Sequence, residues 1–313
     1  MRLIQLESPQ GRRLGVVEDD RIRLLSGPRS VYDFVAQRDE RGDEFLDYAL
    51  IYAGDSAWRI LPAIDHPAEP ARCMVSGTGL THIRSAANRN AMHAGAASET
   101  DSMKMYRWGV EGGKPAPGEA GTSPEWFYKG TGLALRAHNQ PLDVPAYAED
   151  GGEEPEVAGV YVIDASGTPR RIGLVTGNEF SDHVLEKRNY LYLASSKLRP
   201  CAIGPELVLD APFDLIEGEV SIERAGAVLW SKAIRTGESA MCHSLANIEH
   251  HHFKFEAHRR PGDVHVHFFG ADAFSFGEGI RLKDGDVMQV RWDGLGRPLR
   301  NAVRKAGTSQ AGA

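Results

Sequence analysis

Two apolar runs on either side of one short polar stretch constrain the fold of this chain more than any other feature. The first run, VAGVYVI, covers residues 157–163, and the second, IGLVTGNEF, covers residues 172–180. Between them lies DASGTPRR, which is rich in residues that favour turns. Runs of this length, rich in Val and Ile and joined by a short turn, predict an antiparallel β-hairpin.

Three carboxylates, Glu154, Glu156 and Glu179, lie at the open end of this predicted hairpin, and we call them the carboxylate triad. Side chains two residues apart on a strand leave from the same face, about 6.6–6.8 Å apart along it. A two-residue loop at Ser166-Gly167 would place Glu179 opposite Glu154, and a later turn would pair it with Glu156 instead. A slip of one residue would move Glu179 to the far face.

Such a triad is typical of a site for a hard cation. Three like charges at this spacing repel one another, so without a cation at least one carboxylate should be protonated. All-oxygen ligands with no nearby Cys favour Mg²⁺, with Mn²⁺ or Ca²⁺ as further options. The alternative interpretation is a solvated acidic loop around EDGGEEPE, the usual fate of a charge run.

The rest of the chain from residue 71 onward reads as a sheet-rich unit. Short apolar runs are separated by Gly, Pro and Asp, and EGEVSIERAGAVLWS predicts a second hairpin with its turn at Ala225-Gly226. One good helical segment runs from Ser239 to about Ala257. This pattern predicts an α+β, mainly β fold rather than alternating βαβ units.

Residues 1–70 are predicted to form a small N-terminal α+β domain, ahead of a catalytic domain over residues 71–313. The opening segment alternates as a β-meander with a turn at residues 18–20. A helix is expected from Ser30 to Gly54 with Ser30 as its cap, and the alternative is an interruption in its charged middle. The Pro-rich stretch LPAIDHPAEPARC ends this unit.

Composition excludes several classes of protein. A net charge of −7 argues against nucleic acid or an acidic membrane surface as a partner. Apolar runs are much shorter than the roughly 18 residues of a membrane span, and the N-terminus does not resemble a signal peptide, so the expected location is the cytoplasm. The scattered cysteines Cys73, Cys201 and Cys242 are expected to be buried small hydrophobes.

An ordered set of motifs resembles the fumarylacetoacetate hydrolase superfamily. In chain order these motifs are PEWFYKG, EPEVAGVYV, GNEFSDHVLEK, SSKLRPCAIGPELVL and PGDVHVHFFG. The resemblance covers the chain from about residue 74 and implies a mixed β-sandwich roll with Mg²⁺ held by Glu154, Glu156 and Glu179. At position 179 the family usually has Asp.

Within that superfamily, carbon–carbon hydrolases share a His and a Glu that activate water. The corresponding positions in this chain are Ser85 and Asn88, so that dyad is missing. The chain looks more like the 2-keto-3-deoxypentonate dehydratases and the related GguC-like proteins of bacterial sugar operons. That resemblance implies Glu125, Lys197 and Arg199 as catalytic residues.

Further basic residues, Lys129 and Arg84, are candidates for substrate binding, although Lys129 could equally pair with a carboxylate. Lys197 and Arg199 lie two apart in a strand-like run and are expected to point the same way. A nearby Arg and metal should lower the pKa of Lys197, and the planar Arg199 suits a substrate carboxylate.

The predicted activity is therefore a metal-dependent dehydration of a 2-keto-3-deoxy pentonate to a 2-oxoglutarate semialdehyde. Either Glu125 or Lys197 would take the C3 proton while hydroxide leaves from C4. The alternatives are a hydrolase that cleaves a carbon–carbon bond of a 2,4-diketo-3-deoxy sugar acid, and a noncatalytic sugar-acid binding protein. The resemblance also implies a homodimer or homotetramer.

The histidine run 250–252 does not favour zinc, because adjacent residues on a helix point in different directions.

Overall fold

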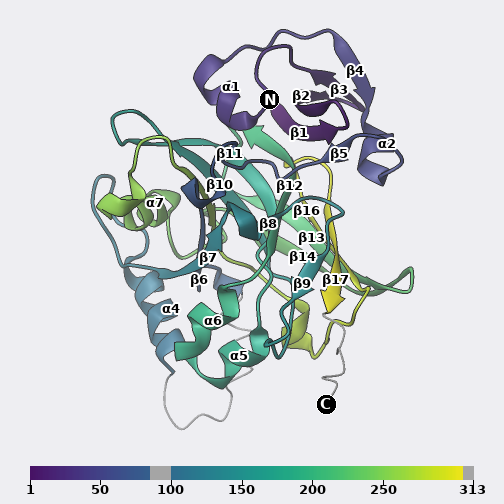
Figure 1. Ribbon diagram of the computed structural model, residues 1–313. Coiled ribbons are helices and arrows are strands. Elements are labelled where there is room, and N and C mark those ends of the chain that lie inside the picture. Colours follow the sequence, from purple (N-terminus) through teal and green to yellow (C-terminus); the bar gives the residue numbers. More distant parts are fainter. Residues whose placement is uncertain (85–99, 306–313) are drawn as a thin grey trace, which may run out of the picture.

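The computed structural model describes residues 1–84 and 100–305, and two β-sheets dominate it (Figure 1). The strands of the larger sheet are β1 Arg2–Ser8, β2 Gly11–Glu18, β3 Arg21–Leu24, β4 Glu44–Asp47, β5 Arg59–Ile60, β6 Cys73–Gly79, β7 Glu125–Thr131, β8 Leu135–Arg136, β10 Pro155–Ile163, β11 Pro169–Asn178, β12 Cys201–Leu209 and β15 Val264–Phe268. Within the described residues their order is β4-β3-β2-β1-β12-β11-β10-β15-β6-β7, with β5 paired to β1 and β8 to β12.

A smaller sheet packs on one face of the larger one. Its strands are β9 Leu142–Val144, β13 Ile216–Arg224, β14 Ala227–Thr236, β16 Val287–Trp292 and β17 Leu299–Lys305, and over the described ranges their order is β14-β13-β16-β17-β9. Buried apolar side chains of the two sheets form one cluster, which includes Val157, Leu174 and Val208 of the larger sheet and Val220, Val290 and Trp292 of the smaller. The predicted α+β, mainly β fold and its mixed β-sandwich roll are confirmed.

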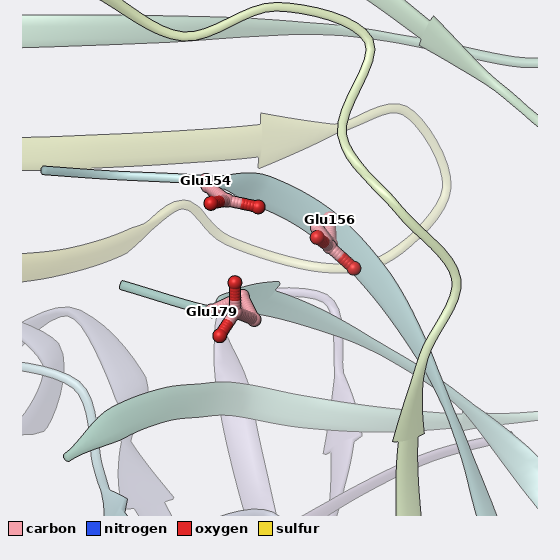
Figure 2. A group of neighbouring side chains, drawn as sticks. All are labelled: Glu154, Glu156 and Glu179. Carbon is pink, nitrogen blue, oxygen red and sulfur yellow. The ribbon is translucent and has the colours of Figure 1, made fainter. Parts of the chain in front are cut away.

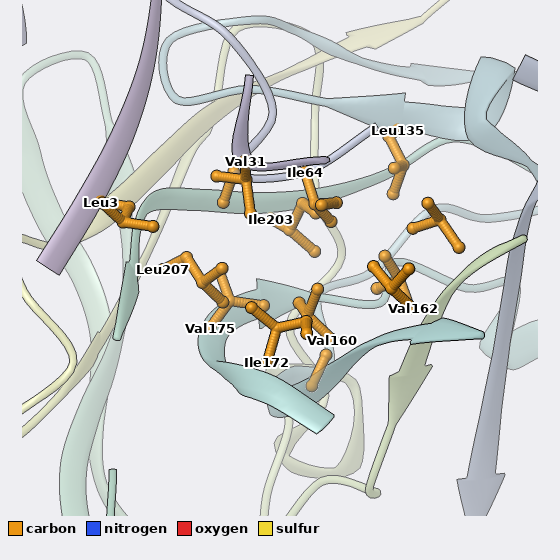
Figure 3. Close-up of a cluster of buried hydrophobic side chains, with 14 of the residues drawn as sticks. Leu3, Val31, Ile64, Leu135, Val160, Val162, Ile172, Val175, Ile203 and Leu207 are labelled. Atoms are coloured by element: carbon orange, nitrogen blue, oxygen red, sulfur yellow. The ribbon is translucent and has the colours of Figure 1, made fainter. Parts of the chain in front are cut away.

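The other face of the larger sheet encloses the main core (Figure 3). Val160 and Val175 come from the central hairpin, Ile203 from β12, and Leu3 from β1. All four are fully buried, and burial of each such aliphatic side chain stabilises the fold by about 1.5–3 kcal/mol. Because the carboxylate triad lies on the hairpin that supplies this core, its backbone is held by tertiary packing.

Helices are short and lie at the margins of the sheets. They are α1 Val31–Gln37, α2 Tyr48–Ala53, α4 Asp101–Gly112, α5 His183–Arg188, α6 Leu193–Lys197 and α7 Leu245–Phe253. Figure 1 shows α1 and α2 at one end of the molecule and α4, α5 and α6 at the other. In the described part of the chain, no helix is long and apolar enough to cross a membrane.

Two helix predictions were wrong in extent. Ser30 caps α1 as predicted, but the helix ends at Arg38, which has φ 49°, and β4 lies between α1 and α2. The charged segment between the apolar clusters has too few core-facing residues to stay helical. The helix expected from Ser239 begins only after its cap Ser244, because the preceding residues form turns.

The N-terminal meander is confirmed, with its second turn at Asp19, which has φ 52°. Its first strand pairs with β12, with Leu3 opposite Leu207, so these strands extend the larger sheet. The division into domains at residue 70 stays a prediction. The hairpin of β13 and β14 is also confirmed, and positive φ angles at Ala225 and Gly226 match a two-residue turn.

The central hairpin has the predicted register at its open end but not the predicted loop. Pro155 pairs with Asn178, and at the other end backbone N of Asp164 donates to O of Thr168 over 3.0 Å. The loop is therefore residues 165–167, one residue more than the predicted pair at 166–167. A bulge beside Val160 inserts the compensating residue in β11. The bulge restores the register, which places Glu154 opposite Glu179.

Candidate metal centre and active site

The carboxylate triad converges at the open end of the β10–β11 hairpin (Figure 2). Backbone N of Glu179 donates to O of Glu154 over 3.0 Å, which fixes the two residues opposite each other. All three side chains are buried, and one oxygen atom from each lies within 4.8 Å of the others. Among the described residues, this is the only group of three or more His, Cys, Asp or Glu residues that meets this criterion.

The donor set of the triad fits a hard divalent cation. Three carboxylate oxygens within 4.8 Å can reach one ion through bonds of about 2.0–2.6 Å. Glu156 is oriented by the backbone N–H of Gly270, which donates to its Oε2 over 2.6 Å. With three protein ligands, an ion such as Mg²⁺ would keep coordination positions for water and substrate.

Two buried lysines share the site with the triad. Lys129 Nζ lies 2.5 Å from Glu179 Oε1 and donates to the carbonyl of Phe180 over 2.8 Å. Lys197 Nζ lies 2.6 Å from Glu179 Oε2 and 2.8 Å from Glu154 Oε1. These contacts show that Lys129 pairs with a carboxylate, which was one of its two predicted roles.

The pKa values of Glu179 and Glu156 are shifted in opposite directions. Burial alone would raise the pKa of Glu179, but Lys129 and Lys197 outweigh it and lower that pKa to about 2. Burial and the neighbouring carboxylates Glu179 and Glu154 raise the pKa of Glu156 well above its usual value. The raised pKa of Glu156 agrees with the expectation that one carboxylate of the triad is protonated in the absence of a cation.

Strand β7 presents Glu125 and Lys129 on its buried face, with Phe127 between them. Lys197 Nζ lies 4.7 Å from the centre of the Phe127 ring, so residues of β7 and α6 meet at one place. Glu125 pairs across the ladder with Gly79 of β6, and a Cβ atom at position 79 would overlap the Glu125 carboxylate. Glycine at position 79 therefore leaves the space that the Glu125 carboxylate occupies.

Lys197 and Arg199 do not lie on a strand, so that local prediction was wrong. Lys197 is the last residue of α6, and Arg199 follows it in an irregular segment. Both side chains are nevertheless buried. In the absence of a cation, burial would lower the pKa of Lys197, but Glu154, Glu179 and Glu186 outweigh it and raise that pKa well above its usual value. The lowering expected beside a bound metal stays a prediction.

Arg199 contacts protein groups on both sides of the hairpin. Its guanidinium donates to the carbonyl of Asp150 over 2.7 Å and to the carboxylate of Asp182 over 3.2 Å. The two contacts join the segment before β10 to the segment after β11. Arg199 thus fixes the backbone on which Glu154 and Glu179 lie.

Arg84 is half-exposed and pairs with the buried Asp272 over 3.6 Å. Asp272 lies two residues after Gly270, whose backbone N–H orients Glu156. A role for Arg84 in substrate binding stays a prediction. The positions of the missing dyad, Ser85 and Asn88, lie outside the described residues.

Sequence reasoning missed two residues that contact the triad. Ser181 Oγ donates to Glu179 Oε2 over 2.7 Å and accepts from Lys197 over 2.9 Å. His183 Nε2 lies 3.0 Å from Glu154 Oε1. Their only sequence signal is the short spacing after Glu179, in the run EFSDH.

Four histidines, His252, His258, His265 and His267, form a separate cluster between α7 and β15. His252 Nε2 lies 3.0 Å from His265 Nδ1, and the rings of His252 and His267 stack with centroids 4.2 Å apart. Both nitrogens of His267 contact hydroxyls, those of Ser76 and Thr78. This cluster is a buried hydrogen-bonded layer outside the carboxylate site.

Two packed sheets that form a roll, with a carboxylate triad on one hairpin, define a protein of the fumarylacetoacetate hydrolase fold. No family model matches the sequence. A probable 2-keto-3-deoxyxylonate dehydratase of Haloferax volcanii is 28% identical over 190 residues, which span 58% of this chain and 60% of that protein. The chain therefore matches less than two thirds of the length of that relative.

Solved structures cover nearly the whole chain. The apo form of 2-keto-3-deoxy-D-arabinonate dehydratase aligns with a TM-score of 0.74 at 22% identity, covering 98% of this chain and 99% of that one. Its complex with magnesium and 2,5-dioxopentanoate aligns with a TM-score of 0.73, also at 22% identity and with the same coverage. A 5-carboxymethyl-2-hydroxymuconate delta-isomerase of Mycobacterium smegmatis, at 19% identity, covers 98% of this chain and all of its own with a TM-score of 0.61. These alignments confirm the fold that the motif resemblance implies.

Proposed function

We propose that this protein is a metal-dependent dehydratase that removes water from a 2-keto-3-deoxy pentonate and yields 2,5-dioxopentanoate, the semialdehyde of 2-oxoglutarate. The observation that carries the proposal is the buried triad, whose oxygens lie within 4.8 Å of one another beside the lysine Lys197. Similarity to a probable 2-keto-3-deoxyxylonate dehydratase and the fold shared with 2-keto-3-deoxy-D-arabinonate dehydratase support it.

Glu154, Glu156 and Glu179 would hold the cation, for which Mg²⁺ is the first choice and Mn²⁺ or Ca²⁺ the alternatives. When bound, the cation withdraws electron density from the keto oxygen of the substrate and makes the C3 protons more acidic. Glu156 would give up the proton that it holds in the cation-free state. Lys129 and Lys197 would keep the remaining charges balanced.

Glu125 and Lys197 are the groups proposed to move protons. Lys197 is protonated among its carboxylate partners, so its Nζ is suited to protonate the hydroxide that leaves C4. Glu125, on the buried face of β7, would take the C3 proton as the C3–C4 double bond forms. Two proton shifts, from C5 to C3 and from the enol oxygen to C4, then give the aldehyde at C5.

Three basic residues are proposed to support the reaction, one by binding the substrate and two by holding the site in place. Arg84 is half-exposed and so is the residue best suited to bind the substrate carboxylate. Lys129 would act through Glu179, its ion-pair partner. Arg199, with its guanidinium engaged by Asp182, would act by holding the hairpin segments in place.

We further propose that the enzyme acts in the cytoplasm on a small sugar acid, as a homodimer or homotetramer. The three cysteines, Cys73, Cys201 and Cys242, are free and buried, which supports a reducing compartment. Light scattering on the purified protein would measure the number of subunits.

The test is turnover of both C4 epimers of 2-keto-3-deoxypentonate by the purified protein with Mg²⁺. A semialdehyde dehydrogenase coupled to NAD⁺ reports the product, and EDTA and the variant Glu156→Gln serve as controls. We expect the semialdehyde from at least one epimer, and only with the metal. Cleavage of a 2,4-diketo-3-deoxy acid without any dehydration would replace this proposal by the hydrolase. Ligand-dependent stabilisation without turnover would replace it by a binding protein.

A further inference from the structure

We propose that His183 is a positioning residue for the metal ligand Glu154. The inference rests on the proposed metal site and assigns part of its rigidity to one histidine. His183 Nε2 lies 3.0 Å from Glu154 Oε1, the oxygen that Lys197 also contacts. Two donors on one oxygen restrict rotation of the carboxylate and present its other oxygen to a cation.

The tautomer of His183 follows from its surroundings. A carboxylate oxygen only accepts, so Nε2 must carry the hydrogen that lies between the two side chains. Nδ1 is buried and has no hydrogen-bond partner in the described part of the chain. The contact with Glu154 therefore uses the hydrogen on Nε2. Burial would lower the pKa of His183, but the hydrogen bond and charge of Glu154 outweigh burial and raise it.

The ring of His183 is held from two sides. Phe274 stacks on it with ring centroids 4.7 Å apart and an interplanar angle of 17°, and Phe276 lies at 5.1 Å. On another side the backbone of Gly152 approaches so closely that a Cβ there would overlap the imidazole. A side chain confined in this way can hold a carboxylate in one orientation.

The buried carboxylate of Glu153 holds the segment that carries Phe274 and Phe276 beside Glu154. Glu153 accepts from backbone N of Ser275 over 2.6 Å and from its Oγ over 2.9 Å. Ser275 lies between Phe274 and Phe276, and Glu153 directly precedes Glu154. Glu153 thus holds Ser275, the phenylalanines on either side of Ser275 hold the His183 ring, and His183 contacts Glu154, the neighbour of Glu153. Residues that orient metal ligands in this manner change metal affinity by about 10–100-fold when replaced.

The experiment measures Mg²⁺ binding by calorimetry on wild type and three variants, without substrate. His183→Gln places an amide nitrogen near the position of Nε2, His183→Asn is a matched amide that is too short, and His183→Phe keeps the ring without a donor. We expect the Mg²⁺ dissociation constant to rise about 10–100-fold for Asn and Phe and less than about 3-fold for Gln. Circular dichroism would verify the folded state of each variant.

The proposal is overturned if folded His183→Phe binds Mg²⁺ within about 2-fold of wild type, or if Gln and Asn weaken binding equally. If His183→Phe does not fold, the Mg²⁺ dissociation constants of the Gln and Asn variants alone test the proposal, because these two side chains carry the same amide and differ only in length. Failure of the wild-type protein to bind Mg²⁺ would instead overturn the proposed metal centre, so the two failures are distinguishable.

Discussion

Lys129 Nζ lies 2.5 Å from Glu179 Oε1, and neither side chain is exposed. The pair joins the edge strand β7 to the end of β11 and supplies a positive charge to a site that also gathers carboxylates. In the absence of a cation this charge stabilises the folded state. When a cation binds, the same charge competes with it.

Lys129→Met should therefore destabilise the metal-free protein and make its stability depend more on Mg²⁺. Loss of one partner of a buried ion pair costs on the order of 3 kcal/mol, and a bound cation would replace part of the lost charge. Urea unfolding in EDTA and in Mg²⁺ measures both effects. The exposed Lys254→Met is the control and should change stability by less than about 0.5 kcal/mol. Equal Mg²⁺ stabilisation in wild type and Lys129→Met would contradict the competition.

Glu156→Gln should abolish activity and leave the fold intact. The amide oxygen can still accept from Gly270, and neutral Gln resembles the protonated Glu156 of the metal-free state. Loss of a ligand charge at the reacting centre should lower kcat/KM by about 10³-fold or more. Steady-state turnover and calorimetric Mg²⁺ binding measure the loss, while circular dichroism follows the fold. Full activity in this variant would show that the triad does not hold the catalytic cation.

Gly79→Ala should lower activity more than stability. The added Cβ would overlap the flexible end of Glu125, which can move aside at little cost to folding but then leaves its place in the site. A displacement of this kind can cost about 10²-fold in kcat. Gly77→Ala is the contrasting variant, because its Cβ would meet the packed rings of Phe127 and Phe268 and should destabilise the core. Unchanged kcat in Gly79→Ala would argue against a catalytic role for Glu125.

The sequence predicts the hairpin and the triad because their signals are local. Alternation with a period of two fixes which residues share a face, and the turn residues fix the approximate register. Even there the predicted loop was one residue too short, since nothing local signals the bulge in β11 that restores the pairing of Glu154 with Glu179. The predicted pairing of the hairpin therefore matches the structure at its open end, which carries the triad, and not at its loop.

Lys129 and Lys197 are candidates from the sequence, but their contacts with the triad, and the contact of His183, could not be found in this way. Lys129, Lys197 and His183 come from an edge strand and two short helices, and only packing brings them together. The segment around Lys197 has no clear period, so it was read as a strand although it is the end of a helix. The same convergence raises the pKa of Lys197 in the metal-free protein, because neighbouring carboxylates outweigh burial.

The buried histidine cluster predicts loss of stability in mild acid. Burial, with neighbouring His258, lowers the pKa of His265 to about 4, and burial lowers that of His267 to about 3, from 6.5 in each case. A depressed folded pKa gives stability that is present above pH 6.5 and is lost as the pH falls toward the folded value. Each pKa unit corresponds to about 1.4 kcal/mol, so His265 alone can contribute about 3 kcal/mol.

Urea unfolding of the metal-free protein at several pH values between 6.5 and 4 would test this window. We expect the free energy of unfolding to fall as the pH decreases, because unfolded histidines bind protons that the buried ones exclude. His265→Asn, whose amide oxygen can accept from His252, should lessen the slope by up to about one proton. Carboxylates that titrate in the same range affect both proteins alike, so the difference isolates the histidine. Identical slopes in wild type and variant would mean that His265 does not titrate on unfolding as its burial requires.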